Sequence, residues 1–207
     1  MSLPVRIVAG ACVFAALAVI DLCRRGRAAT RWREYAFLLW AMLLAMAYGA
    51  LNDQVTSRIS WEYFYYGKEL DKVLGPRIPP DAAALHWEAM KVGIKATWSV
   101  GLLMGAALLI ANNPSPGGRQ LSFSRLTAAL GIVLGVTVLT AAIGGWLGSQ
   151  GWLDWISADF SQMRRTGVFR PDRFLCTFGI HLGGYFGAAA GTGLAVLAVR
   201  RWRRYRY

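Results

Sequence analysis

Acidic and basic side chains interrupt the apolar stretches of this chain, and an ionisable group in such a place normally faces a partner or water. Asp53 follows one apolar stretch, at the end where a helix dipole disfavours a carboxylate. Glu88, Lys91 and Lys95 begin the next stretch at spacings that place them on one helix face. We expect a cation near Asp53, either Lys91, Lys95 or Arg58, as a structural ion pair or as part of a ligand, proton or metal site. Lys95 should face the helix bundle, whereas Lys91 could face the bundle or extend to the membrane surface.

Histidine and carboxylate side chains raise the possibility of a metal centre. His181 lies within an apolar stretch, where it could bond to a neighbouring helix, bind a metal or move protons. A mixed nitrogen and oxygen ligand set would suit a transition metal such as iron, zinc or manganese. Its candidate ligands are Asp53, Glu62, His86, Glu88 and His181. The chain has no HExxH, Walker A or GxSxG signature, so the sequence leaves open whether it is an enzyme.

Five apolar stretches bounded by charge must position these side chains. Each is close to the ~20 residues that a helix needs to cross a bilayer, and a spanning segment must satisfy its own backbone hydrogen bonds. With 56% hydrophobic and 16% charged residues, the 207-residue chain departs from soluble composition. We therefore predict an all-α integral membrane bundle, a single domain over residues 1–207. Its five transmembrane helices are expected at residues 5–22, 35–51, 87–111, 126–149 and 174–199.

The basic residues are distributed unequally between alternate boundaries of these stretches. One set of boundaries carries twelve basic residues and two acidic ones, while the other carries ten basic and nine acidic residues. This asymmetry predicts an N-terminus outside and a C-terminus in the cytoplasm. The net charge of +12 is then explained by topology and by contact with anionic lipids at the cytoplasmic face, and nucleic-acid binding is not expected.

Two connections on the outer side are unusual. Residues 52–86 predict one long outer loop, with an aromatic run at 61–66 expected at the membrane interface. The prolines of residues 75–81 should prevent any helix before the third span. The apolar spacing within residues 151–173 predicts a short amphipathic helix that lies either on the outer membrane surface or in a groove of a partner protein. Its apolar face would carry Trp152, Ile156, Phe160 and Met163.

Small residues recur at four-residue spacing in three of the predicted spans. Such ridges allow close helix approach in membranes. We expect the third, fourth and fifth spans to pack tightly together through these ridges. The ridge of the third span comprises Gly93, Thr97, Gly101 and Gly105. The fourth span has two pairs, Gly131 with Gly135 and Gly144 with Gly148, and the ridge of the fifth span comprises Gly179, Gly183, Gly187 and Gly191.

The run Tyr48–Arg58, which reads YGALNDQVTSR and is followed by EYF, resembles a group of uncharacterised bacterial polytopic membrane proteins. Their pattern reads YGxxHDQVTxR, EYF, a Gly-His pair and a late HxxxYxxG helix, to which His181 and Tyr185 are similar. The chain departs from this pattern at two positions: it has Asn52 and Lys68 where the pattern has histidine. The resemblance covers about three-quarters of the chain and implies a shared site region. If the family binds metal through those histidines, this chain lacks two ligands.

Three functional hypotheses follow. The first is a binding protein or accessory subunit of the bacterial inner membrane, which acts with other membrane subunits through a polar, aromatic-lined site at its periplasmic face. Its site would comprise Asn52, Asp53, Gln54, Arg58, Glu62, Glu88, Lys91, Lys95 and Tyr185. The second is a membrane-embedded metal-binding or redox enzyme. The third is a small proton-coupled transporter that uses Asp53, Lys95 and His181.

Overall fold

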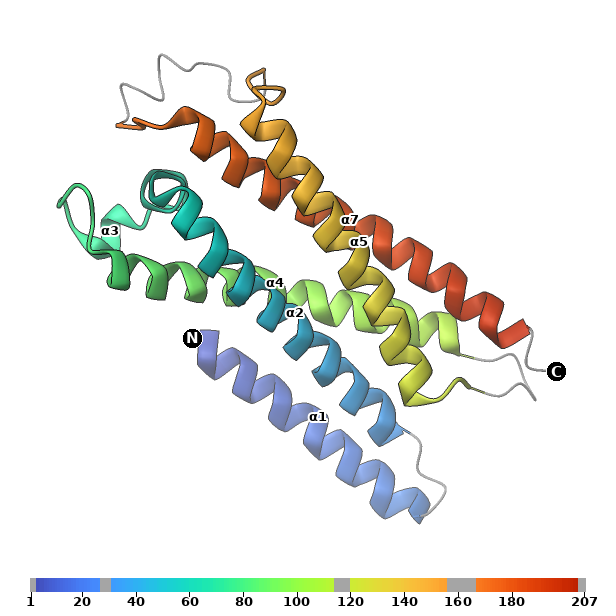
Figure 1. The fold of residues 1–207 in the computed structure, drawn as a ribbon. Coiled ribbons are helices and arrows are strands. Elements are labelled where there is room, and N and C mark those ends of the chain that lie inside the picture. Colours follow the sequence, from blue (N-terminus) through green and yellow to red (C-terminus); the bar gives the residue numbers. More distant parts are fainter. Residues whose placement is uncertain (1–2, 27–30, 114–119, 156–166, 205–207) are drawn as a thin grey trace.

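The computed structural model describes residues 3–26, 31–113, 120–155 and 167–204. This part of the chain is helical and contains no strand. Its elements are α1 (Leu3–Arg25), α2 (Arg31–Ile59), the π-helix η2 (Tyr63–Gly67), α3 (Asp71–Leu74), α4 (Ala82–Asn112), α5 (Phe123–Ser149) and α7 (Pro171–Arg204), shown in Figure 1.

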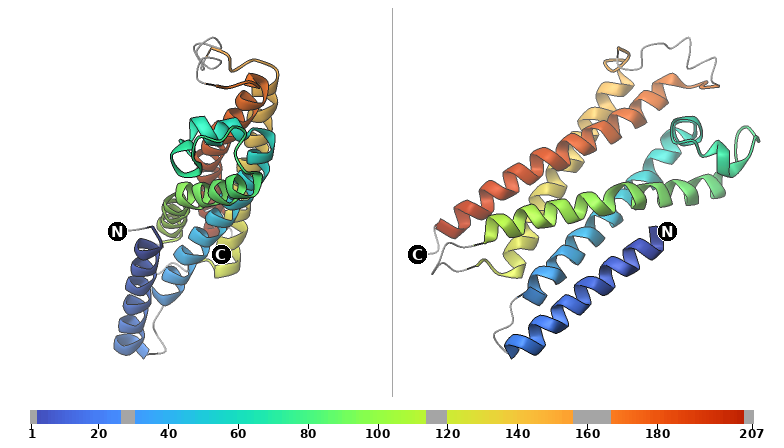
Figure 2. Two further views of the ribbon diagram at one scale, coloured as in Figure 1. Left: turned by 90° about the vertical axis from the view of Figure 1, so that its left-hand side faces the viewer. Right: turned by 180° about the vertical axis from the view of Figure 1, so that it is seen from behind.

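Among the described helices, four are long and apolar enough to cross a membrane: α2, α4, α5 and α7. They include four of the five predicted spans. The remaining predicted span, residues 5–22, is the first along the chain and lies in the 23-residue helix α1, so its crossing of the membrane remains a prediction. Helix α1 lies along α2, on the side away from α5 and α7 (Figures 1 and 2).

The outer loop is shorter than predicted. Helix α2 continues to Ile59, because the polar residues after Leu51 are compatible with a helix and three of them are buried against other helices: Asp53, Thr56 and Ser57. The connection to α4 therefore covers residues 60–81 and itself contains η2 and α3. Helix α4 begins at Ala82, directly after the proline-containing segment and five residues before the predicted start of the third span, and the carboxylate of Asp81 caps it by accepting from the Ala84 N–H at 2.8 Å.

The four long helices form two close pairs, α2 with α4 and α5 with α7 (Figure 1). In each pair, the space that a Cβ would need at a ridge glycine is occupied by the partner's backbone. Gly93 of α4 meets Gly49 of α2 in this way, and Gly183 of α7 meets Thr140 of α5. The prediction that the ridges of α4, α5 and α7 pack together is thus right for Gly144 and Gly148 of α5 against α7. It is wrong for α4, and for Gly131 and Gly135 of α5, which have nothing within 4 Å. A ridge shows that a helix will be approached closely, but it does not identify the approaching helix.

Two apolar clusters join the pairs at opposite ends. One comprises Phe37, Ala41, Leu108, Ala111, Leu121, Leu126, Ala129, Leu130, Val133, Ala195 and Val199. The other is centred on Tyr63, Phe64, Leu70, Leu85 and Ala89, with Phe174 and Phe178 packed against it. The aromatic run was predicted at the membrane interface, but Tyr63, Phe64 and Tyr65 are buried. The π-helical turn η2 places the rings of Tyr63 and Phe64 between the first turns of α4 and α7.

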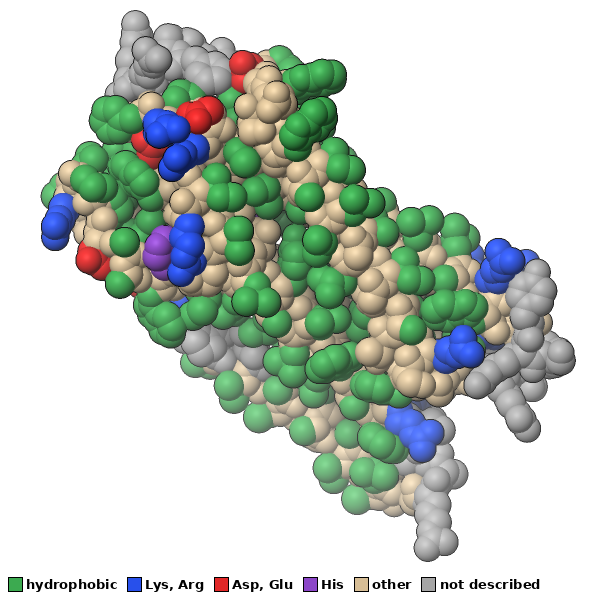
Figure 3. All heavy atoms as spheres, viewed as in Figure 1, with side chains coloured by type: hydrophobic (Ala, Val, Ile, Leu, Met, Phe, Trp, Pro, Cys, Tyr) green, Lys and Arg blue, Asp and Glu red, His purple; other side chains and the backbone are tan. Residues whose placement is uncertain are grey.

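The net positive charge lies at one end of the bundle, because few acidic residues accompany the basic ones there. The end of α1, the start of α2, the start of α5 and the end of α7 lie together there (Figure 1). Figure 3 shows blue side chains without red at this end, and both colours at the other. The antiparallel arrangement of the helices therefore places the unequal boundaries on opposite ends, as the charge pattern requires.

The predicted interfacial helix lies mostly outside the described residues. Residues 151–155 form turns, in which Leu153 is buried and Trp152 is exposed. Ile156, Phe160 and Met163 fall in the undescribed stretch, so the helix prediction is untested.

Candidate functional site

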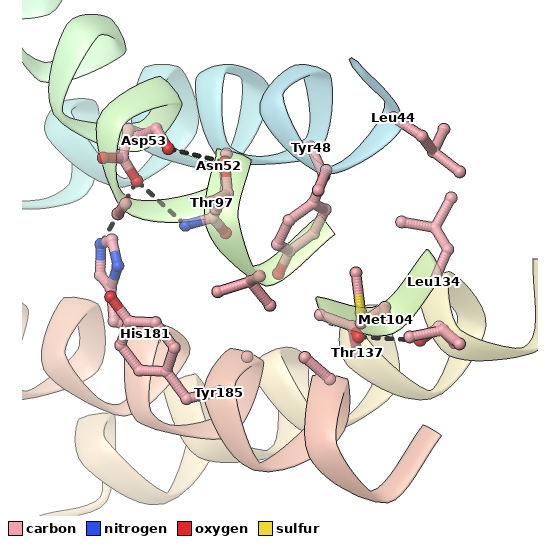
Figure 4. Close-up of a pocket in the computed structure, with 18 of the residues that line it drawn as sticks. Leu44, Tyr48, Asn52, Asp53, Thr97, Met104, Leu134, Thr137, His181 and Tyr185 are labelled. Carbon is pink, nitrogen blue, oxygen red and sulfur yellow. Dashed lines mark hydrogen bonds and ion pairs between the residues drawn. The ribbon is translucent and has the colours of Figure 1, made fainter. Parts of the chain in front are cut away.

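A cavity lies between the two helix pairs, in the interval between the two apolar clusters. Its volume is about 80 Å³, and its walls come from α2, α4, α5 and α7 (Figure 4), with Lys68 also part of the lining. Most of the wall is apolar. The polar side chains that line it are Tyr48, Asn52, Asp53, Lys68, Thr97, Thr137, His181 and Tyr185. In Figure 4 Asn52, Asp53 and His181 lie at one end, and Leu44, Met104 and Leu134 lie at the other.

Asp53 and His181 face one another across the two pairs. The Asp53 side chain is 4% exposed and its Oδ1 atom lies 3.6 Å from His181 Nε2. The same carboxylate oxygen accepts from the Asn52 side-chain amide at 3.2 Å. Helix α2 supplies Asp53 from its buried face, and α7 supplies His181 beside the glycine ridge that packs on α5. An acid and an imidazole are thus held together in the part of the molecule enclosed by the spans.

The hydrogen bonds around His181 indicate its tautomer. Thr56 Oγ1 donates to the Asn52 carbonyl at 2.9 Å, in the i to i−4 manner, and also lies 3.4 Å from His181 Nε2. Because the hydroxyl proton of Thr56 is used in the bond to Asn52, its oxygen is left to accept. His181 Nε2 then carries the proton and directs it between the Thr56 hydroxyl and the Asp53 carboxylate.

The π-helix η2 covers the polar end of the cavity. The Tyr63 ring stacks on the His181 ring, with 4.9 Å between centroids and 18° between planes, and Phe64 meets that imidazole edge-on. The Lys68 ammonium lies 5.3 Å from the centre of the Tyr63 ring. Burial, together with the nearby Tyr185 and Asp53, raises the pKa of Tyr63, so the phenol stays protonated at physiological pH.

The predicted pairing of Asp53 with Lys91 or Lys95 is wrong. The Lys91 ammonium instead bonds to Glu88 at 2.5 Å, and Lys95 is exposed, not directed into the bundle. The reason is that α4 packs through the face that contains Gly93. Both lysines are two residues from Gly93, which is about 200° around the helix.

Other predicted site residues tie the outer segments together. Glu62 is 2% exposed, and its two carboxylate oxygens accept from the backbone N–H groups of Phe169 at 2.7 Å and Arg170 at 3.1 Å. His86 Nδ1 lies 2.8 Å from Ser57 Oγ, and the His86 carbonyl accepts from Gln54 at 2.7 Å. These bonds join α2 to α4, and the segment before η2 to the segment before α7.

Arg58 lies in the last turn of α2 and is exposed. Its guanidinium donates to the Gln54 side chain at 3.0 Å and also to the Gln54 carbonyl. It therefore does not supply the cation expected beside Asp53, and the cationic side chain that lines the same cavity is Lys68.

The five candidate metal ligands do not converge. In the described part of the chain, no three histidine, cysteine or carboxylate residues come close enough to hold a metal ion. Asp53 and His181 are neighbours, whereas Glu62, His86 and Glu88 are engaged with the separate partners named above. An iron, zinc or manganese centre with this ligand set is not supported.

Several residues that line the cavity or contact His181 escaped the sequence prediction. Thr56 lies one helical turn after Asp53, so the period of α2 could have indicated it. Tyr48 and Lys68 appeared in the family-like pattern but carried no predicted role. The wall contributed by α5, with Leu134 and Thr137, has no local signal, because only the packing of the pairs brings it to the cavity.

Comparison of the chain with protein-family models, curated proteins and solved structures finds no match. The resemblance to bacterial polytopic membrane proteins therefore remains an expectation. The functional interpretation therefore depends on the cavity and on the Asp53–His181 pair at its polar end.

Proposed function

We propose that this protein acts by binding a small molecule in the cavity between its two helix pairs. The observation that carries the proposal is the polarity of the walls. Asn52, Asp53 and His181 are gathered at one end (Figure 4), and most of the remaining wall is apolar, apart from the tyrosine and threonine side chains named above. Ligand sites in proteins typically combine a mostly apolar wall with a few placed polar groups.

An unfilled void of this size does not stabilise a close-packed helix bundle. Packing in protein interiors leaves few spaces larger than a water molecule, and each void forfeits contacts along its lining. Water could occupy the polar end, since one molecule needs only ~10–15 Å³ of such space, but an apolar lining offers it no hydrogen-bond partners. A ligand with both polar and apolar parts would satisfy both halves of the wall.

The exposed lining residues indicate the route of entry. Tyr185 of α7 is 49% exposed and Ala96 of α4 is exposed, although both also line the cavity. An opening between α4 and α7 would communicate with the bilayer at mid-helix, so the ligand would enter from the membrane.

We further propose that the protein lies in the bacterial inner membrane with its N-terminus outside and its C-terminus in the cytoplasm. The basic end of the bundle supports this orientation. It requires α1 to be a fifth span. Cysteine labelling in intact cells and in inverted vesicles tests it: residues 200–207 should react only from the cytoplasmic side, and labelling of that tail from the periplasm would contradict the orientation.

Native mass spectrometry of protein purified in nanodiscs tests the binding proposal. A small molecule should co-purify with the natural protein and be lost from Ala188→Phe, because Ala188 lines the cavity and the larger side chain would occupy part of it. Ala189→Phe is the matched control, because Ala189 is the exposed neighbour on the same helix and does not line the cavity. Absence of a bound molecule, or equal content in both variants, would contradict the proposal. The same purification in mild detergent reports whether other subunits accompany the chain.

A second candidate function is proton-coupled transport, and the close approach of Asp53 and His181 favours it. Lys95, which was predicted to take part, is exposed and has no place in this version. In liposomes loaded with a pH-sensitive dye, a membrane potential should drive proton entry through the natural protein and not through Asp53→Asn. Equal proton entry through both would rule the transport role out.

A further inference from the structure

We propose that the molecule bound in the cavity is a single-chain amphiphile with a small uncharged head, such as a long-chain alcohol, and that its head lies against Asp53 and His181. This inference rests on the proposed binding function and adds the chemical class of the ligand.

The length of the cavity points to a chain. Its lining residues run along α2 from Asp53 to Ala41, and along α4 from Val92 to Met104. Each interval is twelve residues, or about 18 Å of helix. A volume of about 80 Å³ spread over such a length is narrow. It suits a linear hydrocarbon chain better than a compact ring system.

The polar end points to an uncharged head. Asp53 is an acceptor, Lys68 is a donor, the Asn52 amide can donate, and the unprotonated ring nitrogen of His181 can accept. The opposite charges of Asp53 and Lys68 offset one another, while the other titratable groups that face this end, Tyr48, Tyr63, Tyr185 and His181, are neutral in their ordinary forms. A head with a net charge would face a like charge in a region of low dielectric. A hydroxyl group can donate to the carboxylate and accept from the ammonium or from the Asn52 amide.

The head, and not the chain, must provide selectivity. A hydrocarbon chain that moves from the bilayer into the cavity leaves one apolar environment for another, so no hydrophobic gain accompanies the transfer. The chain contributes by filling the space between Leu44, Met104 and Leu134. Hydrogen bonds at the head are unavailable in the lipid interior, and one such bond of ordinary strength corresponds to about a tenfold change in affinity.

Photolabelling of the full chain in nanodiscs tests this. Three twelve-carbon probes with a diazirine near the chain end would differ only in their head: hydroxyl, carboxylate or trimethylammonium. The hydroxyl probe should label the far wall, around Met104 and Leu134, about tenfold more than the charged probes, and unlabelled dodecanol should compete with it. Ala188→Phe should abolish this labelling and Ala189→Phe should retain it.

Two charge variants make the test independent of folding. Asp53→Asn leaves the Lys68 charge unopposed and should shift preference toward the carboxylate probe. Lys68→Met leaves the Asp53 charge unopposed and should shift preference toward the ammonium probe. Opposite shifts cannot arise from a general loss of structure.

The outcomes separate the two proposals. Equal labelling of the cavity by all three heads, unchanged in the charge variants, would overturn the uncharged-head inference while leaving a chain-binding cavity. Preference for a charged probe in the natural protein would also overturn it. Failure of every probe to label the cavity, with no effect of Ala188→Phe, would overturn both proposals.

Discussion

Substitution of Glu62 by glutamine should destabilise the protein by more than any change of one surface carboxylate. Glu62 is buried, and its two oxygens accept from two backbone N–H groups, those of Phe169 and Arg170. A hydrogen bond to a charged group contributes ~1.5–3 kcal/mol. In Glu62→Gln, the amide oxygen can keep one bond while the amide NH₂ faces the second N–H group. We therefore expect a loss of about 1.5–3 kcal/mol in the free energy of unfolding, measured by SDS titration in mixed micelles.

Glu69→Gln is the matched control for this measurement. It removes the same charge from the same outer segment, but Glu69 is exposed and its partner is the exposed side chain of Lys72. Surface ion pairs of this kind contribute little. If Glu62→Gln lowered the unfolding free energy no more than Glu69→Gln, the tie between the segment before η2 and the segment before α7 would not stabilise the fold, and the reasoning would be refuted.

Three further predictions concern packing, an exposed charge and pH. Gly183→Leu should separate α5 from α7 and strongly destabilise the protein, because a Cβ there would meet the backbone of Thr140. Gly131→Leu is the control and should be tolerated, because nothing lies within 4 Å of the Cβ position at Gly131. An equal loss of unfolding free energy in the two variants would contradict this prediction. Lys95→Ala should leave stability unchanged, and a clear loss would show that Lys95 has a partner in the bundle. Burial raises the pKa of Tyr63 above the value of about 10 that it has in an unfolded chain, so the stability that Tyr63 contributes is complete below pH 10 and falls as the pH rises further. Tyr63→Phe should make stability less dependent on pH in that range, and an unchanged pH profile would count against it.

The sequence predicts the helices well because the bilayer restricts the options. Apolar length alone identifies α2, α4, α5 and α7, although it placed the end of α2 near residue 51 and not at Ile59. Residues beyond the apolar stretch continue the helix because Asp53 and Thr56 find partners on α7. A hydropathy profile contains no information about such partners.

The candidate site was predicted in part. Asp53 and His181 were both singled out, since a charge or an imidazole in an apolar segment requires a partner. Both residues were placed in one candidate metal site, but a direct Asp53–His181 pair was not predicted, because charge complementarity favoured the lysines of α4 over a neutral histidine. The orientation of α4 is decided by the close contact of Gly93 with Gly49, which turns the lysines away. Pairing of the ridges is a tertiary property, and the spacing of small residues within one helix does not encode it.

The most direct test of the central claim uses the two histidines of the chain, His86 and His181. His181 lies at the polar end of the cavity, whereas His86 is hydrogen-bonded to Ser57 and does not line it. In ¹⁵N NMR of the imidazole nitrogens, with the protein in nanodiscs and each signal assigned by substitution, the account predicts that dodecanol shifts the His181 signals and leaves those of His86 in place. Unchanged His181 signals at saturating dodecanol, or equal shifts of both residues, would contradict binding at the Asp53–His181 end of the cavity.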